Sequence, residues 1–170
     1  MLLSGRSPLI AHRRVGWRGT PLWMLKLRTM WSPGASRRFC WVEYIDDDFG
    51  PTRKHARDTR VPNAFARFCR RHSLDELPQL WHVARGQMAL VGPRPLTVRE
   101  IRDHYGAAAE ETLSLKPGIA GLWQTSGRNR LTYEERRGFD LEFVRRRSIR
   151  MYLRIAARTL PEIWTGANSW

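Results

Sequence analysis

The chain has 170 residues, a length that fits one domain with a hydrophobic core of useful size. Its 30 lysines and arginines outnumber its 16 aspartates and glutamates, and the resulting net charge of +14 predicts an anionic partner: nucleic acid, an acidic membrane face or a phosphorylated substrate. A hydrophobic fraction of 42% with eight tryptophans argues against disorder, and no apolar run is long enough to span a bilayer. Cys40 and Cys69 form no Cys-x-x-Cys pattern, which is typical of a reduced cytosolic setting.

Two short strands are predicted near the start of the chain, over residues 9–15 and 22–28, with a four-residue hairpin loop between them. Lys26 and Arg28 are two positions apart on the second strand, so their side chains should project from the same face. On this pattern alone, the ordinary interpretation is a solvated strand face.

A pair of adjacent carboxylates, Asp75 and Glu76, follows a short helix predicted over residues 63–72. Pro78 is suited to the first position of a helix, so the carboxylates would lie in the turn that enters it. Alternatively, Ser73 caps a helix that begins earlier, and Glu76 closes a capping box. Either start puts both carboxylates at the positive end of a helix, which keeps them ionised. They could equally be ordinary acids of a first turn.

A strand is predicted over residues 88–91, followed by a rigid Gly-Pro-Arg-Pro turn that presents Arg94. Thr97 and Glu100 have the spacing of a capping box, which predicts a helix that ends near Gly106. A second helix is expected to follow over residues 107–115.

The C-terminal third is predicted to contain an extended segment over residues 119–124, a tight turn at 127–128 and a helix that starts after Thr132 and reaches about residue 147. Asp140 lies within this arginine-rich helix and is most simply an ion-pair partner. It is also placed to orient Arg94 or Arg128.

A last helix is predicted over residues 149–164, where Arg150, Arg154 and Arg158 form a basic stripe at four-residue spacing. Apolar residues fill much of the remaining surface of this helix. Two interpretations stay open: a core helix with a wet edge, or a basic amphipathic helix that lies on an anionic membrane.

Taken together, four blocks in this order resemble the bacterial sugar transferases, the monotopic phosphoglycosyltransferases that start the assembly of exopolysaccharides, O antigens and glycoprotein glycans. They cover most of the chain, which makes the resemblance far more specific than a single motif. The blocks are Lys26-Leu27-Arg28-Thr29-Met30; Asp75-Glu76-Leu77-Pro78-Gln79-Leu80 with Val91-Gly92-Pro93-Arg94-Pro95; Lys116-Pro117-Gly118-Ile119-Ala120-Gly121-Leu122-Trp123-Gln124 with Ser126-Gly127-Arg128; and Asp140-Leu141-Glu142-Phe143.

The resemblance implies one compact, helix-rich α+β domain over residues 1–170, with a hairpin in residues 1–30, a catalytic block at 73–95 and an amphipathic helix at 149–164. It also implies a peripheral or monotopic location on the cytoplasmic face of the bacterial inner membrane. Family members carry a membrane-dipping hydrophobic helix just before the region that corresponds to residues 9–16. This chain opens almost at that point, so we expect a truncated or mis-assigned start; a shorter, peripherally held protein is the alternative.

The family's reaction moves a sugar-1-phosphate from a nucleotide diphospho-sugar, here expected to be a UDP-sugar, to a polyprenyl phosphate such as undecaprenyl phosphate. The resemblance implies that Asp75 is the nucleophile, that it forms an aspartyl phospho-sugar intermediate, and that Glu76 binds or orients Mg²⁺. Two cations that point the same way suit a diphosphate, so the resemblance favours Lys26, Arg28 and Arg94 as phosphate ligands. Further substrate contacts are expected from Arg60, Gln124, Arg128 and Asp140.

Two alternatives come from other classes of protein. A basic nucleic-acid-binding domain would explain the net charge without any catalysis. It leaves the adjacent carboxylates Asp75 and Glu76 and the rigid Gly-Pro-Arg-Pro turn unexplained, so nucleic acid is not expected as a partner. A catalytically silent scaffold on the membrane surface is the other alternative, and it predicts that a change of Asp75 has no effect on the product; the transferase is preferred.

Overall fold

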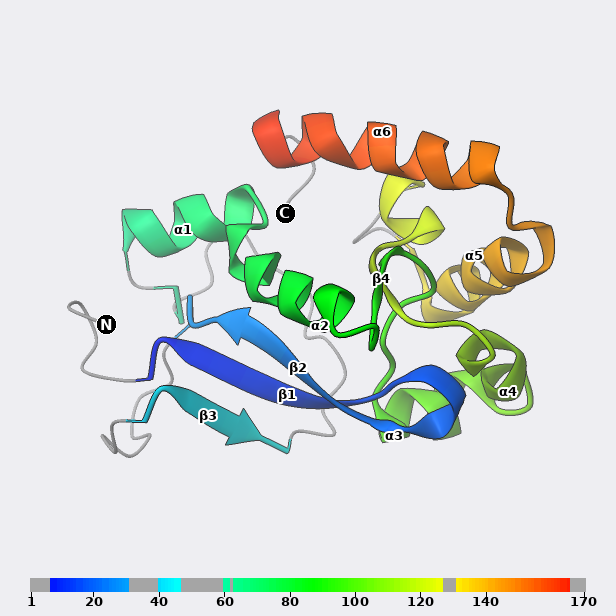
Figure 1. Cartoon of the computed structure of the whole chain (residues 1–170), viewed down its shortest axis with the longest axis horizontal. Coiled ribbons are helices and arrows are strands. Elements are labelled where there is room, and N and C mark those ends of the chain that lie inside the picture. The colour runs from blue at the N-terminus through cyan, green and yellow to red at the C-terminus, as the bar shows by residue number, and fades with distance from the viewer. Residues whose placement is uncertain (1–6, 31–39, 47–59, 62, 127–130, 166–170) are drawn as a thin grey trace.

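The computed structural model of the chain describes residues 7–30, 40–46, 60–61, 63–126 and 131–165. It contains both helices and strands in one small domain, which confirms the α+β fold (Figure 1). No helix within these ranges is long and apolar enough to cross a membrane.

The first sheet has three strands in the order β2-β1-β3, formed by β1 (Leu9–Val15), β2 (Pro21–Leu27) and β3 (Val42–Ile45). The strands β1 and β2 form the predicted antiparallel hairpin, whereas β3 runs parallel to β1. The hairpin loop reverses through Arg18 and Gly19, which have φ angles of 53° and 79°. This order leaves β2 at an edge of the sheet, where its outer N–H groups need partners from other elements.

A run of short helices lies along this edge: α1 (Ala64–Arg71), the 3₁₀ helix η2 (Leu74–Gln79) and α2 (Leu80–Ala84) (Figure 1). Both carboxylates lie in the first turn of η2, as predicted. One of the two predicted helix starts is correct in position, because Ser73 is the N-cap residue of η2, but its side chain makes no capping hydrogen bond and its φ is 52°. The other predicted start is wrong, because Pro78 lies inside η2 rather than at the start of a helix.

The rest of the chain builds a helical half around a two-stranded parallel sheet. Thr97 and Thr132 both form the predicted capping boxes. The expected extended segment at 119–124 is only half right, because a 3₁₀ turn replaces its second part. The elements are β4 (Ala89–Val91), α3 (Val98–Glu100), the π-helix η3 (Ile101–Tyr105), α4 (Ala108–Leu113), β5 (Gly118–Ala120), the 3₁₀ helix η4 (Leu122–Thr125), α5 (Tyr133–Arg146) and α6 (Ile149–Thr165).

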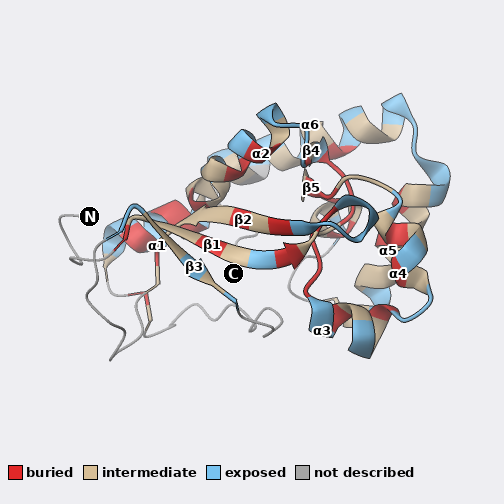
Figure 2. Ribbon diagram, turned by 60° about the horizontal axis from the view of Figure 1, so that its bottom comes forward, coloured by how far each residue is buried: buried red, intermediate tan, exposed pale blue. Residues whose placement is uncertain are grey.

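The main core cluster joins β4, β5, α5 and α6 through Val91, Ala120, Phe143 and Ile155 (Figure 2). Ile155 is 1% exposed, so one side of α6 is a true core face. The arginines of the predicted basic stripe on α6 are all exposed. The last helix therefore combines a buried side with a basic, solvent-facing side.

A close backbone approach holds the turn that carries Arg94. Gly92 N donates to Ala120 O at 2.9 Å, and Gly118 N donates to Pro93 O at 2.8 Å. A Cβ atom on Gly118 would lie 2.0 Å from the backbone nitrogen of Gly92, a distance that no side chain can occupy. Glycine at 118 therefore allows the turn after β4 to lie directly on β5.

This contact predicts that Gly118→Ala forces the two strands apart and lowers the free energy of unfolding by about 1–3 kcal/mol or more. The matched control is Gly138→Ala in α5, where the added methyl group meets nothing within 4 Å. That change should raise the free energy of unfolding by about 0.4–1 kcal/mol, because alanine has less freedom in the unfolded chain. Urea unfolding of both variants measures the difference, and equal stabilities would contradict the close approach.

Candidate active site

The carboxylate turn of η2 lies against the strand that carries Lys26. Lys26 Nζ donates to Glu76 Oε1 at 2.9 Å, and both side chains are about one quarter exposed, at 25% and 24%. Asp75, the neighbouring carboxylate, is only 5% exposed. The fold thus joins a cation from β2 with two acids that lie about 50 positions later in the chain.

The helix before this turn contributes Cys69, a buried thiol. Burial raises the pKa of the Cys69 thiol, and the nearby Asp75 carboxylate raises it further. Both effects keep Cys69 a neutral thiol beside Asp75. The helix α1 therefore places a neutral thiol near the Asp75 carboxylate.

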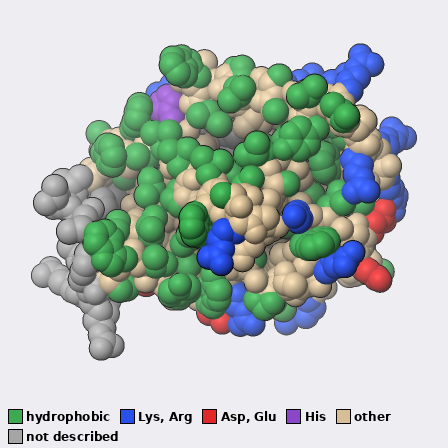
Figure 3. Space-filling model, viewed as in Figure 1, with side chains coloured by type: hydrophobic (Ala, Val, Ile, Leu, Met, Phe, Trp, Pro, Cys, Tyr) green, Lys and Arg blue, Asp and Glu red, His purple; other side chains and the backbone are tan. Residues whose placement is uncertain are grey.

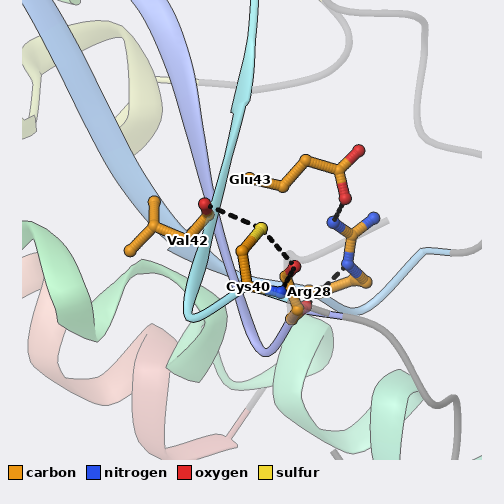
Figure 4. A network of polar contacts seen from close by, with 5 residues as sticks. Arg28, Cys40, Val42 and Glu43 are labelled. Carbon is orange, nitrogen blue, oxygen red and sulfur yellow. Dashed lines mark hydrogen bonds and ion pairs between the residues drawn. The ribbon is translucent and has the colours of Figure 1, made fainter. Parts of the chain in front are cut away.

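Arg28, the second predicted phosphate ligand on β2, contacts β3 and the residues just before β1 (Figure 4). Its guanidinium pairs with Glu43 of β3, and its Nε donates to Ser7 O at 2.8 Å. The side chain is 8% exposed. These contacts tie Arg28 to the sheet, whereas Lys26, two positions earlier, reaches the carboxylate turn.

Arg94 lies in a second polar cluster, formed by the rigid turn and by α5. Its guanidinium is 3.6 Å from Glu100 and 5.5 Å from the ring centroid of Trp123. Asp140 is 1% exposed and accepts hydrogen bonds from the Tyr105 hydroxyl at 2.8 Å and from the backbone N–H of Arg94 at 3.4 Å. The hydrogen bonds of Asp140 are thus to Tyr105 and to the turn of Arg94 rather than to an arginine of its own helix, because α5 turns Asp140 inward. The predicted contact with Arg94 is present, through its backbone N–H.

The protonation of this cluster follows from its burial. Burial raises the pKa of Asp140 to about 7, although its hydrogen bonds from Tyr105 and Arg94 act in the opposite direction. Burial, with the Asp140 carboxylate as a second cause, also raises the pKa of the Tyr105 hydroxyl. Tyr105 is therefore a hydrogen-bond donor at any physiological pH, and Asp140 changes charge near neutrality.

The remaining predicted contacts are more scattered. Gln124 accepts from the backbone N–H of Gly121 through Oε1, so its side chain caps the start of η4. Arg60 lies half-buried in a turn before α1, and Arg128 lies outside the described residues. Where the chain is described, no group of three or more His, Cys, Asp or Glu side chains is arranged to hold a metal ion.

Arg136 also belongs to the second cluster, although it was not among the predicted site residues. Its guanidinium lies 5.1 Å from the Trp123 ring and 5.4 Å from the Tyr133 ring. Burial, followed by the charge of Arg94, lowers its pKa, and its Nε has no hydrogen-bond partner among the residues that the structure describes. Its position one helical turn before Asp140 was the only available signal.

Comparison with known proteins identifies the family. The family model described as bacterial sugar transferase matches residues 1–166. This chain belongs to the bacterial sugar transferase family. The sugar transferase is therefore an enzyme of the transferase class, as the preferred interpretation predicted.

Named relatives agree with this assignment. The sugar transferase is 38% identical over 169 residues to the exopolysaccharide production protein ExoY of Sinorhizobium fredii, an alignment that covers 98% of this chain and 74% of that protein. It is 38% identical over 163 residues to a UDP-galactose-lipid carrier transferase of Erwinia amylovora, an alignment that covers 92% of this chain and 33% of that protein. It is 36% identical over 146 residues to an undecaprenyl-phosphate galactose phosphotransferase of Salmonella typhimurium, and this alignment covers 83% of this chain and 30% of that protein.

The raised pKa of Asp140 makes a prediction about stability. The folded state holds the Asp140 proton up to a pH of about 7, whereas the unfolded chain releases it near 3.8. The contribution of this proton to the free energy of unfolding is therefore complete below pH 3.8 and is lost as the pH rises toward 7. Relative to the wild type, Asp140→Asn should therefore become more stable between pH 5 and pH 8. Urea unfolding across this range measures the trend.

The control for this prediction is Asp103→Asn. Asp103 is exposed, and its hydrogen bond from Arg102, with weaker help from Arg99, lowers its pKa. It is therefore ionised throughout the range from pH 5 to pH 8, and its replacement should shift stability equally at every pH. The same flat difference for Asp140→Asn would show that Asp140 keeps its charge when buried.

Proposed function

We propose that this sugar transferase moves a sugar-1-phosphate from a UDP-sugar to a polyprenyl phosphate, with undecaprenyl phosphate as the expected carrier. The observation that carries this proposal is the joint placement of Asp75, Glu76 and Lys26 in one site. The names of the relatives support the substrates: one is a UDP-glucose:undecaprenyl-phosphate glucose-1-phosphate transferase from Xanthomonas campestris, 35% identical over 162 residues.

In the first step, an oxygen of the Asp75 carboxylate attacks the phosphorus next to the sugar. The bond from this phosphorus to the bridging oxygen breaks, and UMP leaves with the electron pair. The product is an acyl phosphate in which Asp75 carries the phospho-sugar. A carboxylate is a weak nucleophile, so the reaction depends on holding the phosphorus in line with it.

In the second step, a phosphate oxygen of the polyprenyl phosphate attacks the same phosphorus. The bond between Asp75 and phosphorus breaks, which regenerates the carboxylate and releases the polyprenyl diphospho-sugar. Splitting the transfer in this way lets one site serve a water-soluble donor and a lipid acceptor in turn, with no need to bind both at once.

The charges around Asp75 suit this chemistry. Lys26 neutralises one oxygen of Glu76, so the two adjacent acids repel each other less and the Lys26 ammonium stays close to the site of attack. Arg94, fixed by the rigid turn, is proposed to bind phosphate oxygens as a planar, bidentate donor. Arg28 remains proposed as a phosphate ligand, and Arg60, Gln124, Arg128 and Asp140 remain proposed as further substrate contacts.

The donor set also fits Mg²⁺. This ion is commonly held by one or two carboxylates together with the phosphate oxygens of the substrate, so a protein cage of three or more side chains is not required. Glu76, with Asp75 beside it, is the residue that would hold it. When bound, Mg²⁺ would neutralise charge on the transferring phosphoryl group.

The acceptor is a lipid, and one face of the molecule is suited to a membrane surface. Figure 3 shows hydrophobic side chains gathered on the face presented by α1, α2 and α6. The exposed large apolar side chains of these helices and of the adjoining η2 are Phe65, Phe68, Leu77, Leu80, Trp81, Ile149, Leu153, Leu160 and Trp164. With the basic stripe of α6, we propose that this face lies on the anionic cytoplasmic surface of the inner membrane.

Asp75→Asn tests the nucleophile, because the amide keeps the shape of the side chain but cannot form the acyl phosphate. With UDP-sugar and Mg²⁺ but no lipid, the wild type should release UMP in an amount stoichiometric with the enzyme. The variant should lose this release by several orders of magnitude, as expected when a covalent nucleophile is removed. The matched control is Asp103→Asn, and UMP release by Asp75→Asn at the wild-type level would rule out this mechanism.

Replacement of Arg150, Arg154 and Arg158 by Gln tests the membrane face. Binding to vesicles that contain anionic lipid should weaken by about 1 kcal/mol for each cation close to the surface. The control removes three exposed arginines elsewhere, Arg13, Arg99 and Arg102, with the same change in net charge. Equal weakening in both triple variants would show that only the overall net charge matters. Unchanged binding of the α6 variant would show that α6 does not contact the membrane.

A further inference from the structure

His82 connects α2 to the edge strand β2 through its imidazole ring. The side chain is 6% exposed, and its Nε2 accepts a hydrogen bond from the backbone N–H of Leu25 at 3.2 Å. Its Nδ1 lies 2.8 Å from Gln87 Oε1. Because a backbone N–H can only donate, Nε2 must be the acceptor, and Nδ1 carries the proton that is donated to Gln87.

The ring is held rigidly in this position. The backbone carbonyl of His82 accepts from Gln87 N at 2.9 Å and from Met88 N at 3.2 Å, so the segment that leads to β4 closes around the same residue. Gln87 therefore binds the backbone of His82 through its own N–H and the imidazole ring through its side chain. The Leu25 N–H is an outward-facing donor of an edge strand, and the imidazole supplies its acceptor.

This hydrogen bond lies next to the catalytic ion pair along the chain. Leu25 directly precedes Lys26, and α2 directly follows the η2 segment that carries Glu76. A lysine side chain has a flexible stem, so the bond between Lys26 and Glu76 does not by itself fix the strand against the carboxylate turn. The planar imidazole ring of His82, which is hydrogen-bonded to the strand backbone, does fix the strand against this turn.

From this geometry we propose that His82 is a positioning residue for the transfer reaction. Its Nε2 fixes the backbone of β2 beside η2, and so sets where the Lys26 ammonium lies relative to Glu76 and Asp75. The inference rests on the proposed function, since it assigns a task to the same site. It predicts an effect on the chemical step, because a displacement of about 1 Å in a reacting arrangement can lower a rate by about 100-fold.

The experiment compares His82→Leu with His82→Gln in the full chain. Leucine removes the acceptor, whereas the longer amide of glutamine can present an oxygen to the Leu25 N–H. His82→Leu should lower kcat for UMP release by about 10- to 100-fold with nearly unchanged KM for the donor, and His82→Gln should recover most of the loss. The matched control is His104→Leu, a partly buried histidine whose ring stacks on Tyr133 at 3.9 Å instead.

Circular dichroism and thermal melting establish that each variant is folded. If His82→Leu does not fold, Gln87→Leu takes its place, because it removes the partner that orients the ring and should give a smaller loss of kcat. An unchanged kcat in a folded His82→Leu variant, no recovery in His82→Gln, or an equal loss in His104→Leu would overturn the proposal.

A second readout does not depend on turnover. In the wild type and His82→Gln, the Leu25 amide should exchange slowly with solvent, and in His82→Leu it should exchange rapidly. Nitrogen NMR of the neutral wild-type ring should show the proton on Nδ1. If no protein releases UMP but these signatures hold, the proposed function fails and the contact stands; a proton on Nε2, or a Leu25 amide equally exposed in all variants, refutes the positioning role.

Discussion

The contact between the edge strand β2 and the helical run η2–α2 is the constraint on which the site depends. The sheet order leaves the backbone N–H of Leu25 facing outward, and the His82 imidazole accepts it; the Glu76 carboxylate accepts a second hydrogen bond, from the Lys26 ammonium. One bond involves a side chain of the strand and the other its backbone. A cation from early in the chain is thereby held beside two adjacent acids, an arrangement that neither segment forms alone.

In the second polar cluster, which contains Arg94 and Asp140, burial raises the pKa values of the acidic groups. Close approach of the backbone at Gly92 and Gly118 fixes the turn that carries Arg94, and Asp140 receives a backbone N–H from that turn. The carboxyl group is almost completely buried, so its charge is unfavourable near neutral pH. The Arg94 guanidinium is thus placed by a rigid backbone and lies near the Trp123 ring and Glu100.

Features with local causes could be predicted from the sequence. The β1–β2 hairpin, the capping boxes at Thr97 and Thr132 and the position of both carboxylates in a first turn depend on neighbours within a few residues. Features with distant causes could not. Nothing local indicates that Asp140 bonds Tyr105 or that Arg28 pairs with Glu43, because helix packing and strand pairing create both contacts. The family resemblance carried the assignment of Asp75 beyond what its neighbours could support.

The most direct measurement of the central claim is the mass of the peptide that contains Asp75. A membrane-competent form of the protein is incubated with Mg²⁺ and UDP-sugar without lipid acceptor, quenched in acid and digested. We expect this peptide to gain the mass of one phospho-sugar, and to lose it when polyprenyl phosphate is added before the quench. An adduct on another peptide, or UMP release that requires the acceptor and leaves no adduct, would contradict the account.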